Sequence, residues 1–286
     1  MILVITGPTG VGKTKMSIEL AKFYNAIIIN ADSMQIYKGL DIGTAKIKEE
    51  EKAGIPHELF DIKEVTEMYT VYDYQRDVRS LLKKYEDRNI ILVGGTGLYI
   101  KAALYDYKFQ EETKEDLSNI SNDELYNLCL KKDPNCEIHK NNRKRLERFI
   151  SREESNGKNT LLYKATFIGL TTDRENLYNI INKRVDKMLD EGLVDEVKYF
   201  YDLNIRSKAI MTGIGYKELY KYFDGLISLE EAIEEIKKNS RKYAKRQYTW
   251  FNNQMDINWF TVDFNNFNNT IKDVIKFIES SENNEI

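Results

Sequence analysis

Residues 7 to 14 read "GPTGVGKT" and follow a short apolar run, Ile2 to Ile5. They match a glycine, four variable positions and then Gly-Lys-Thr, which is the pattern of a phosphate-binding P-loop. In such a loop the backbone N–H groups and the positive end of the following helix attract anions, the lysine reaches the terminal phosphates, and the threonine hydroxyl can ligate Mg²⁺. An ordinary glycine turn is the alternative, but the order of strand, loop and helix favours the phosphate site. The predicted phosphate-binding residues are Gly7, Pro8, Thr9, Gly10, Val11, Gly12, Lys13 and Thr14.

A second group of polar residues follows the apolar stretch "AIIINA". Asp32 and Ser33 come directly after it, and Gln35 follows at a short distance. A P-loop is typical of proteins that hydrolyse ATP or GTP or transfer a phosphoryl group, but the best later strand ends "ILVGG" without a carboxylate, which argues against hydrolysis. We expect the Asp32 carboxylate to project into the cleft near the phosphates. The spacing equally allows Asp32 to cap a helix, and small-molecule kinases also place an aspartate here, so these residues alone favour a kinase.

The elements that must position these residues alternate between strand and helix. Short apolar strands are expected at Ile2 to Ile5, Ala26 to Ile29 and Ile90 to Val93, with helical patterns between them. This alternation predicts an α/β fold, a P-loop NTPase-like parallel sheet flanked by helices. Because ligands bind at the carboxyl ends of parallel strands, the turns "GPTGVGKT", "NADSMQIYKGLDIGTAK" and "GGTGLYI" are expected to converge on one site.

The pattern after the third strand predicts an inserted helical subdomain. It becomes helical, charged and poor in glycine, and a strand-like "TFIGLT" at 166–171 then returns to the sheet pattern. Beyond that strand we expect only helices, at 175–203, 229–251 and 270–279. The predicted divisions are residues 1–104 for the first part of the core, 105–160 for the helical insertion, and 161–286 for the rest of the core with basic C-terminal helices.

Composition places the chain among globular proteins. It has 286 residues, 42% of them apolar, and a net charge of −3. We expect neither a signal peptide nor a membrane span, and therefore a cytoplasmic protein. Cys129 and Cys136 fit neither a disulfide framework nor a metal motif and are expected to be reduced packing residues. His57 and His139 are too few for a histidine-rich metal site, and neither is next to an obvious nucleophile.

Two basic segments point to a polyanionic partner despite the acidic net charge. One runs from Lys140 to Arg148, and the other from Lys237 to Arg246. Aromatic residues from Tyr243 to Phe251 are interleaved with or follow the second segment, a combination that suits phosphate contact and base stacking. Either segment alone could be a solvated helix face, but the two together favour RNA.

Seven motifs together make the sequence resemble the tRNA dimethylallyltransferases. They are "GPTGVGKT", "NADSMQIYKGLDIGTAK", "GGTGLYI", "NNRKR", "GLVDEV", "GIGYKE" and "YAKRQYTWF", and they follow the family's order from residue 2 to about 252. The long second motif and the last one carry most of this resemblance. It implies transfer of a dimethylallyl group from its diphosphate to the N6 amine of an adenosine beside the anticodon of a tRNA. The P-loop would then hold the diphosphate of an isoprenoid.

The resemblance also implies roles for particular residues. Lys13, Asp32 and Thr96 form the expected catalytic set: Lys13 binds the diphosphate, Asp32 accepts a proton from the amine or hydrogen-bonds to it, and Thr96 lies beside the bridging oxygen. Mg²⁺ is the expected cofactor, held by Thr14 and the diphosphate. The expected partners are dimethylallyl diphosphate and a tRNA anticodon stem-loop whose target base is extruded, with the chain acting as a monomer. The expected tRNA-binding residues are Asp32, Ser33, Met34, Gln35, Asn142, Arg143, Lys144, Arg145, Arg241, Lys245 and Arg246.

Some positions depart from the family's pattern. Glu58 stands where a second histidine is common, Lys140 where a proline is common, and Asn252 where an arginine is frequent. The zinc extension of eukaryotic members is not found in this sequence, so the resemblance is to the bacterial type. The alternatives are an adenylate dimethylallyltransferase that uses free nucleotide, a P-loop kinase of a small metabolite, and an RNA-binding module without activity. The two basic segments favour tRNA as the acceptor.

Overall fold

The computed structural model describes residues 1–109, 116–151 and 160–283. The chain divides into two compact units, one made of Met1–Leu104 with Tyr163–Ile286 and the other of Tyr105–Leu162. The larger unit holds the sheet, and the smaller unit corresponds to the expected helical insertion. Within the described residues, no helix is long and apolar enough to span a membrane.

The larger unit is built on a parallel sheet of six strands in the order β3-β2-β4-β1-β5-β6. This confirms the predicted fold class. The inner strands are almost wholly buried, as their apolar sequences require. The strands are β1 (Ile2–Thr6), β2 (Ala26–Asn30), β3 (His57–Glu58), β4 (Asn89–Val93), β5 (Thr166–Thr171) and β6 (Asn258–Thr261).

The expectation that only helices follow residue 175 was wrong, because β6 pairs with β5. Two of its four residues, "NWFT", are exposed and two are half-buried at the sheet edge, so the strand lacks the buried apolar run that marks the inner strands. The two-residue strand β3 at the other edge was missed for the same reason. Edge strands take their conformation from a neighbour that is distant in sequence, and local patterns do not show this pairing.

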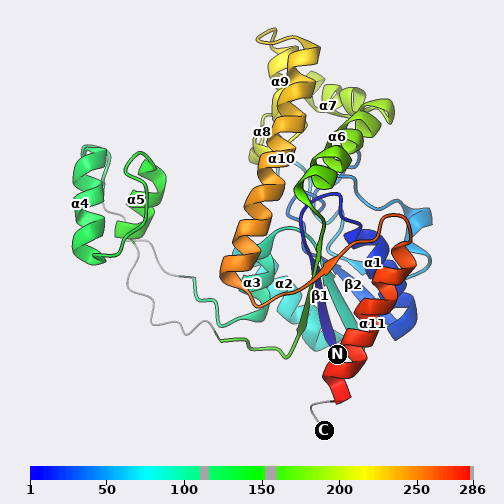
Figure 1. Ribbon diagram of the computed structural model, residues 1–286. Helices are drawn as coiled ribbons and strands as arrows, with labels where there is room; N and C mark the ends of the chain where they lie inside the picture. The colour runs from blue at the N-terminus through cyan, green and yellow to red at the C-terminus, as the bar shows by residue number, and fades with distance from the viewer. Residues whose placement is uncertain (110–115, 152–159, 284–286) are drawn as a thin grey trace. The chain divides into compact units, whose positions relative to one another are not determined.

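Helices cover both faces of the sheet (Figure 1). On one face α1 (Lys13–Tyr24) and α11 (Phe267–Asn283) pack apolar side chains such as Met16, Leu20 and Val274 against the strands. On the other face lie α2 (Val71–Lys84) and α3 (Gly97–Leu104), and the ring of Tyr74 stacks on that of Tyr99 with centroids 4.2 Å apart. The 3₁₀ helix η1 (Glu49–Lys52) follows β2.

Five further helices gather beyond the carboxyl ends of the strands (Figure 1). The single helix expected at 175–203 is two, because Gly192 adopts φ 99°, a left-handed conformation that ends α6 and begins α7. The predicted basic helix is confirmed as the longest, α10. Their bounds are α6 (Arg174–Asp190), α7 (Leu193–Asp202), α8 (Lys208–Thr212), α9 (Tyr216–Phe223) and α10 (Leu229–Gln254).

Among its described residues the smaller unit contains two helices, α4 (Asn122–Lys132) and α5 (Arg143–Ile150). They pack around Leu125, Cys129 and Leu146. Cys129 and Cys136 are both free and buried, as expected of packing residues, and burial raises the pKa of the Cys129 thiol to about 11. No group of three or more metal-ligating side chains occurs among the described residues.

Candidate active site

The P-loop connects β1 to α1 and holds its lysine against its own backbone. Gly12 adopts φ 90° where α1 begins, a conformation that favours glycine. The Nζ of Lys13 donates hydrogen bonds to the carbonyl oxygens of Gly7 and Pro8, at 3.0 and 2.8 Å. The Val11 side chain is fully buried in the core, so this residue offers only its backbone to a ligand. The Lys13 side chain is therefore poised over the loop that is predicted to hold phosphates.

The environment of Lys13 disfavours its charge. Desolvation, reinforced by repulsion from Arg184, lowers the pKa of Lys13 from 10.5 to about 7, while Asp32 acts in the opposite direction. An anion placed in this cavity would relieve the repulsion and restore the ammonium form. Lys13 therefore has the electrostatics of a phosphate ligand as well as the motif.

Arg184 on α6 is a second cation in the same cavity, and the sequence reasoning missed it. Its Nη2 donates to the carbonyl oxygen of Thr44 at 3.2 Å, and desolvation lowers its pKa despite the opposing effect of Asp32. Arg184 has no carboxylate in ion-pair contact among the described residues. The signal available in the sequence was an arginine on the apolar face of a helix, between Ile181 and Met188.

Asp32 both closes a turn and faces the cavity. Its Oδ1 accepts the backbone N–H of Met34 at 3.0 Å, while the Asn30 side chain accepts the Asp32 N–H and donates to its carbonyl oxygen. Its Oδ2 has no hydrogen-bond partner among the described residues. The two interpretations of Asp32 are therefore compatible, since one oxygen orders the turn and the other remains available to a ligand.

The third turn brings Thr96 next to Ser33. The Oγ1 of Thr96 accepts the Ser33 N–H at 3.0 Å and donates to the Ser33 Oγ at 3.3 Å. The Tyr243 side chain on α10 also lies beside Thr96. The pKa of its hydroxyl is raised, mainly by burial and to a smaller extent by the charge of Asp32. The three turns predicted to converge do so.

Gln247 on α10, which the sequence reasoning also missed, joins two of these turns. Its Oε1 accepts the Thr9 N–H at 3.2 Å, and its Nε2 donates to the Gly95 carbonyl oxygen at 3.0 Å. A Cβ on Gly95 would lie 2.0 Å from that Nε2, so only glycine allows the contact. Gly95 and Gly97 allow the close approach of α10, since a Cβ on Gly97 would lie 2.1 Å from the Trp250 ring, and no local pattern reveals this packing.

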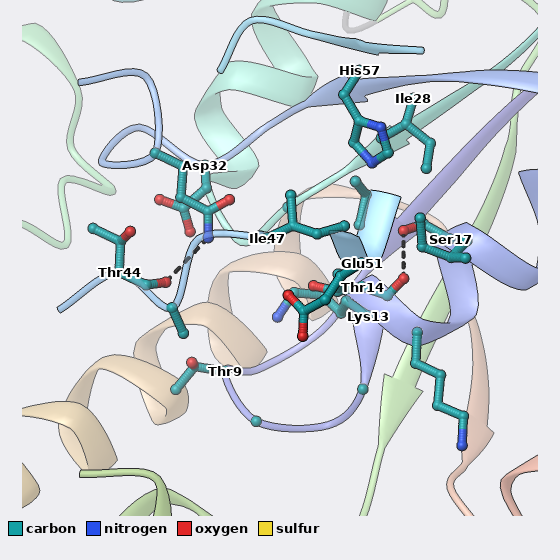
Figure 2. A pocket seen from close by; sticks show the side chains of 18 of the residues that line it. Thr9, Lys13, Thr14, Ser17, Ile28, Asp32, Thr44, Ile47, Glu51 and His57 are labelled. Carbon is teal, nitrogen blue, oxygen red and sulfur yellow. Dashed lines mark hydrogen bonds between the residues drawn. The ribbon is translucent and has the colours of Figure 1, made fainter. Parts of the chain in front are cut away.

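Two cavities meet at this centre, of about 790 and 280 Å³. The larger is lined by the P-loop and by Gln35, and Figure 2 shows Asp32 and Thr44 facing Lys13 and Thr14 across it. The smaller is lined by Ser33, by the Met34 side chain and by the turn before α9. Residues shared by both cavities are Thr9, Asp32, Thr44, Arg184 and Tyr243.

The cations of α10 are of two kinds: some bind other groups of the protein, and others are exposed to solvent. Arg241 donates to the Asn182 Oδ1 at 2.6 Å, whereas Lys245 and Arg246 are exposed, and Arg246 also lines the smaller cavity. The aromatic residues near them mostly pack within the protein: Phe251 is fully buried and therefore cannot stack on a base, and Tyr248 packs on Trp259 with ring centroids 4.8 Å apart.

The basic segment of the smaller unit, Lys140 to Arg148, also contains cations of both kinds. Arg143 donates to the carbonyl oxygens of Leu117 and Ile120 at 2.6 and 2.7 Å and pairs with Glu147. Asn142 precedes the first residue of α5, and its carbonyl accepts from Leu146 N–H at 3.0 Å. Lys144 and Arg145 are exposed. Arg143 therefore has a structural role that its position in a basic run did not reveal.

The fold and the site together define a P-loop protein with two ligand cavities that meet at one carboxylate. The model of the IPP transferase family matches residues 35–254. The tRNA dimethylallyltransferase of Anoxybacillus flavithermus is 48% identical, with 97% of this chain and 96% of that protein covered. The tRNA dimethylallyltransferase of Bacillus subtilis is 46% identical over 91% of this chain and 90% of its own length.

Solved structures agree with these sequence matches. The tRNA isopentenylpyrophosphate transferase of Bacillus halodurans has a TM-score of 0.77 and 41% identity, covering 98% of this chain and 95% of that one. A eukaryotic dimethylallyltransferase acting on tRNA has a TM-score of 0.78 and 29% identity, covering 91% and 73%. This chain belongs to the tRNA dimethylallyltransferase family, as the resemblance of its motifs predicted.

Proposed function

We propose that this protein transfers a dimethylallyl group from dimethylallyl diphosphate to the N6 amine of an adenosine next to the anticodon of a tRNA, releasing diphosphate. The observation that carries this proposal is the position of Asp32, which lines both cavities at the place where they meet. A two-substrate transfer needs such a place, because donor and acceptor must approach one another from separate sites.

The larger cavity is suited to the diphosphate. Lys13 and Arg184 face it, and the charge of Asp32 only partly offsets the desolvation that lowers both pKa values, so a bound anion would stabilise the two cations. The P-loop backbone adds N–H donors at the positive end of α1. As the carbon–oxygen bond of the donor breaks, negative charge develops on the diphosphate, and these groups stabilise it.

The residues present fit a magnesium ion. The Thr14 side chain is exposed at the cavity wall beside Lys13, and Mg²⁺ commonly takes one or two protein oxygens and completes its shell with water and phosphate oxygens. Thr14 would hold the ion together with the diphosphate. When bound, the ion would supply additional positive charge to the leaving group.

Asp32 and Thr96 act on the acceptor side of the same centre. The N6 lone pair forms a bond to C1 of the dimethylallyl group while the bond from C1 to the diphosphate oxygen breaks. Asp32 Oδ2 then takes the proton that the amine loses, since Oδ1 is engaged by the Met34 N–H. The Ser33 N–H donates to the Thr96 Oγ1 and so holds the Thr96 hydroxyl next to the departing oxygen.

The smaller cavity is suited to the target base, with Ser33 and Met34 of the second turn placed to contact it, while Gln35 of the same turn lines the larger cavity. The exposed cations Lys245 and Arg246 would hold the tRNA backbone beside this cavity, and Lys144 and Arg145 of the smaller unit would add contacts elsewhere on the tRNA. We further propose that the protein acts as a monomer in the cytoplasm, where its tRNA substrate would be met.

Incubation of the protein with labelled dimethylallyl diphosphate and Mg²⁺, and separately with tRNA, AMP or ATP, tests the proposed function. We expect label in tRNA alone. Label in AMP or ATP would indicate an adenylate dimethylallyltransferase. Consumption of ATP without prenyl transfer would indicate a kinase, and tRNA binding without either reaction would indicate a binding module. The comparisons favour none of these three alternatives.

A further inference from the structure

Glu196, in the motif "GLVDEV" at the start of α7, binds three consecutive backbone amides of a distant loop. Its Oε2 accepts the N–H groups of Asp41 and Ile42 at 3.1 and 2.7 Å, and its Oε1 accepts that of Gly43 at 3.1 Å. A carboxylate that gathers adjacent N–H groups makes charge-assisted bonds, which are stronger than neutral ones. The loop is therefore anchored by one side chain that lies outside the cavities.

Tyr216, in the motif "GIGYKE", completes this anchor. Its hydroxyl donates to the Glu196 Oε1 at 2.5 Å, and its side chain is fully buried. A Cβ on Gly43 would lie 2.7 Å from the Tyr216 ring and hydroxyl, so the loop backbone approaches as closely as a glycine permits. Two motifs to which the proposed chemistry assigns no role thus meet on the second polar turn.

The anchored loop ends at Thr44, whose carbonyl oxygen orients two side chains of the larger cavity. It accepts the Arg184 Nη2 at 3.2 Å and the Gln35 Nε2 at 3.1 Å. Thr44 O is the one hydrogen-bond acceptor for Arg184 among the described residues. The direction of the guanidinium therefore depends on where the loop is held.

We propose that Glu196 is a positioning residue for diphosphate binding: with Tyr216 it fixes residues 41–43, which sets the Thr44 carbonyl and, through it, the guanidinium of Arg184. This proposal rests on the proposed function of Arg184 as a diphosphate ligand. Arg184 comes from α6 and Glu196 from α7, so the break at Gly192 lets one helix pair supply both the cation and its orienting anchor.

The first test is the affinity of the protein for inorganic diphosphate with Mg²⁺, measured by calorimetry. Glu196→Gln cannot accept from all three amides, because its NH₂ group must face one of them, and we expect binding to weaken by about tenfold. Asp195→Asn is the matched control, since Asp195 is an exposed carboxylate in the same first turn of α7 and is equally placed for the helix dipole. Equal affinity in the two variants would overturn the proposal.

The second test asks whether Glu196 acts through Arg184. In an Arg184→Gln background, Glu196→Gln is expected to weaken diphosphate binding by less than about twofold further, because the group it positions is gone. The same tenfold loss in both backgrounds would overturn the proposal, since a structural role does not depend on Arg184.

Should Glu196→Gln fail to fold, Tyr216→Phe tests the same chain of contacts. It keeps the ring against Gly43 and removes one donor to Glu196, so diphosphate should bind about threefold more weakly, and only when Arg184 is present. Wild-type affinity in Tyr216→Phe would then contradict the proposal. Failure of the proposed function looks different: the wild type would bind diphosphate and transfer no label to tRNA.

Discussion

The cations of the cavity and the cations of α10 carry the same charge in opposite surroundings. Lys13 and Arg184 are half-buried and desolvated, and the pKa of each is lowered. Lys245 and Arg246 are exposed to solvent. Charges removed from water interact strongly and at fixed geometry, whereas exposed charges are screened by salt beyond about 8–10 Å. The first pair is suited to one small anion, and the second to an extended backbone of phosphates.

The largest effect is expected from the carboxylate that lies among the desolvated cations. Asp32→Asn keeps an oxygen for the Met34 N–H and loses the proton acceptor, so single-turnover transfer should fall by about 10²- to 10⁴-fold. tRNA binding and melting temperature should change little, because Asn also orders such turns. A transfer rate within a few-fold of the wild type would remove Asp32 from the chemistry.

The next effect is expected from the P-loop lysine. Lys13→Ala should raise the KM for dimethylallyl diphosphate by roughly 100-fold through loss of a charge-assisted contact, and leave the KM for tRNA within about twofold. Lys83→Ala, which removes an exposed lysine of α2 that lines neither cavity, is the control. Parallel increases in both KM values would mean that the cavity does not separate the two substrates.

The lowered pKa of Lys13 predicts that diphosphate binding depends on pH. The free protein has a Lys13 pKa of about 7, and a bound diphosphate favours the ammonium form and raises it. Binding therefore takes up a proton above pH 7, and affinity should fall as pH rises, by at most about tenfold per unit. Calorimetry from pH 6 to 9 measures this, with Lys13→Gln as the control. The same slope in that variant would assign the effect to another group.

The smallest effect is expected from the exposed pair. Lys245→Ala with Arg246→Ala should weaken tRNA binding several-fold and reduce the slope of log affinity against log salt by about 1 to 2. Lys272→Ala with Lys276→Ala removes the same charge from exposed positions on α11 and is the control. Equal slopes for the two double variants would make the α10 face a solvated surface only.

The features that depend on local motifs could be predicted from the sequence. The P-loop, the position of Asp32 and the convergence of three turns follow from strands that end in polar residues. The partners of each cation could not be predicted in this way. Arg143 and Arg241 stand in basic runs yet bind groups within the protein, whereas Arg184 stands among apolar residues and faces the cavity. Charge and spacing are visible in a sequence, but burial depends on which helices meet.

The residues that join distant segments were missed for the same reason. Gln247 bridges the P-loop and the third turn, and Glu196 anchors the second turn. Each of these contacts joins residues more than a hundred positions apart in the sequence, so no local pattern in either helix predicts it. The edge strand β6 shows the same dependence, because its pairing with β5 decides its conformation.

The central claim is that the amine of one extruded adenosine attacks the donor where the two cavities meet. Two anticodon stem-loops test it most directly, identical except that one carries adenosine beside the anticodon and the other carries a purine without the N6 amine. With labelled dimethylallyl diphosphate and Mg²⁺, we expect label in the first and none in the second, with similar affinities for both. Equal labelling of the two stem-loops would contradict the account.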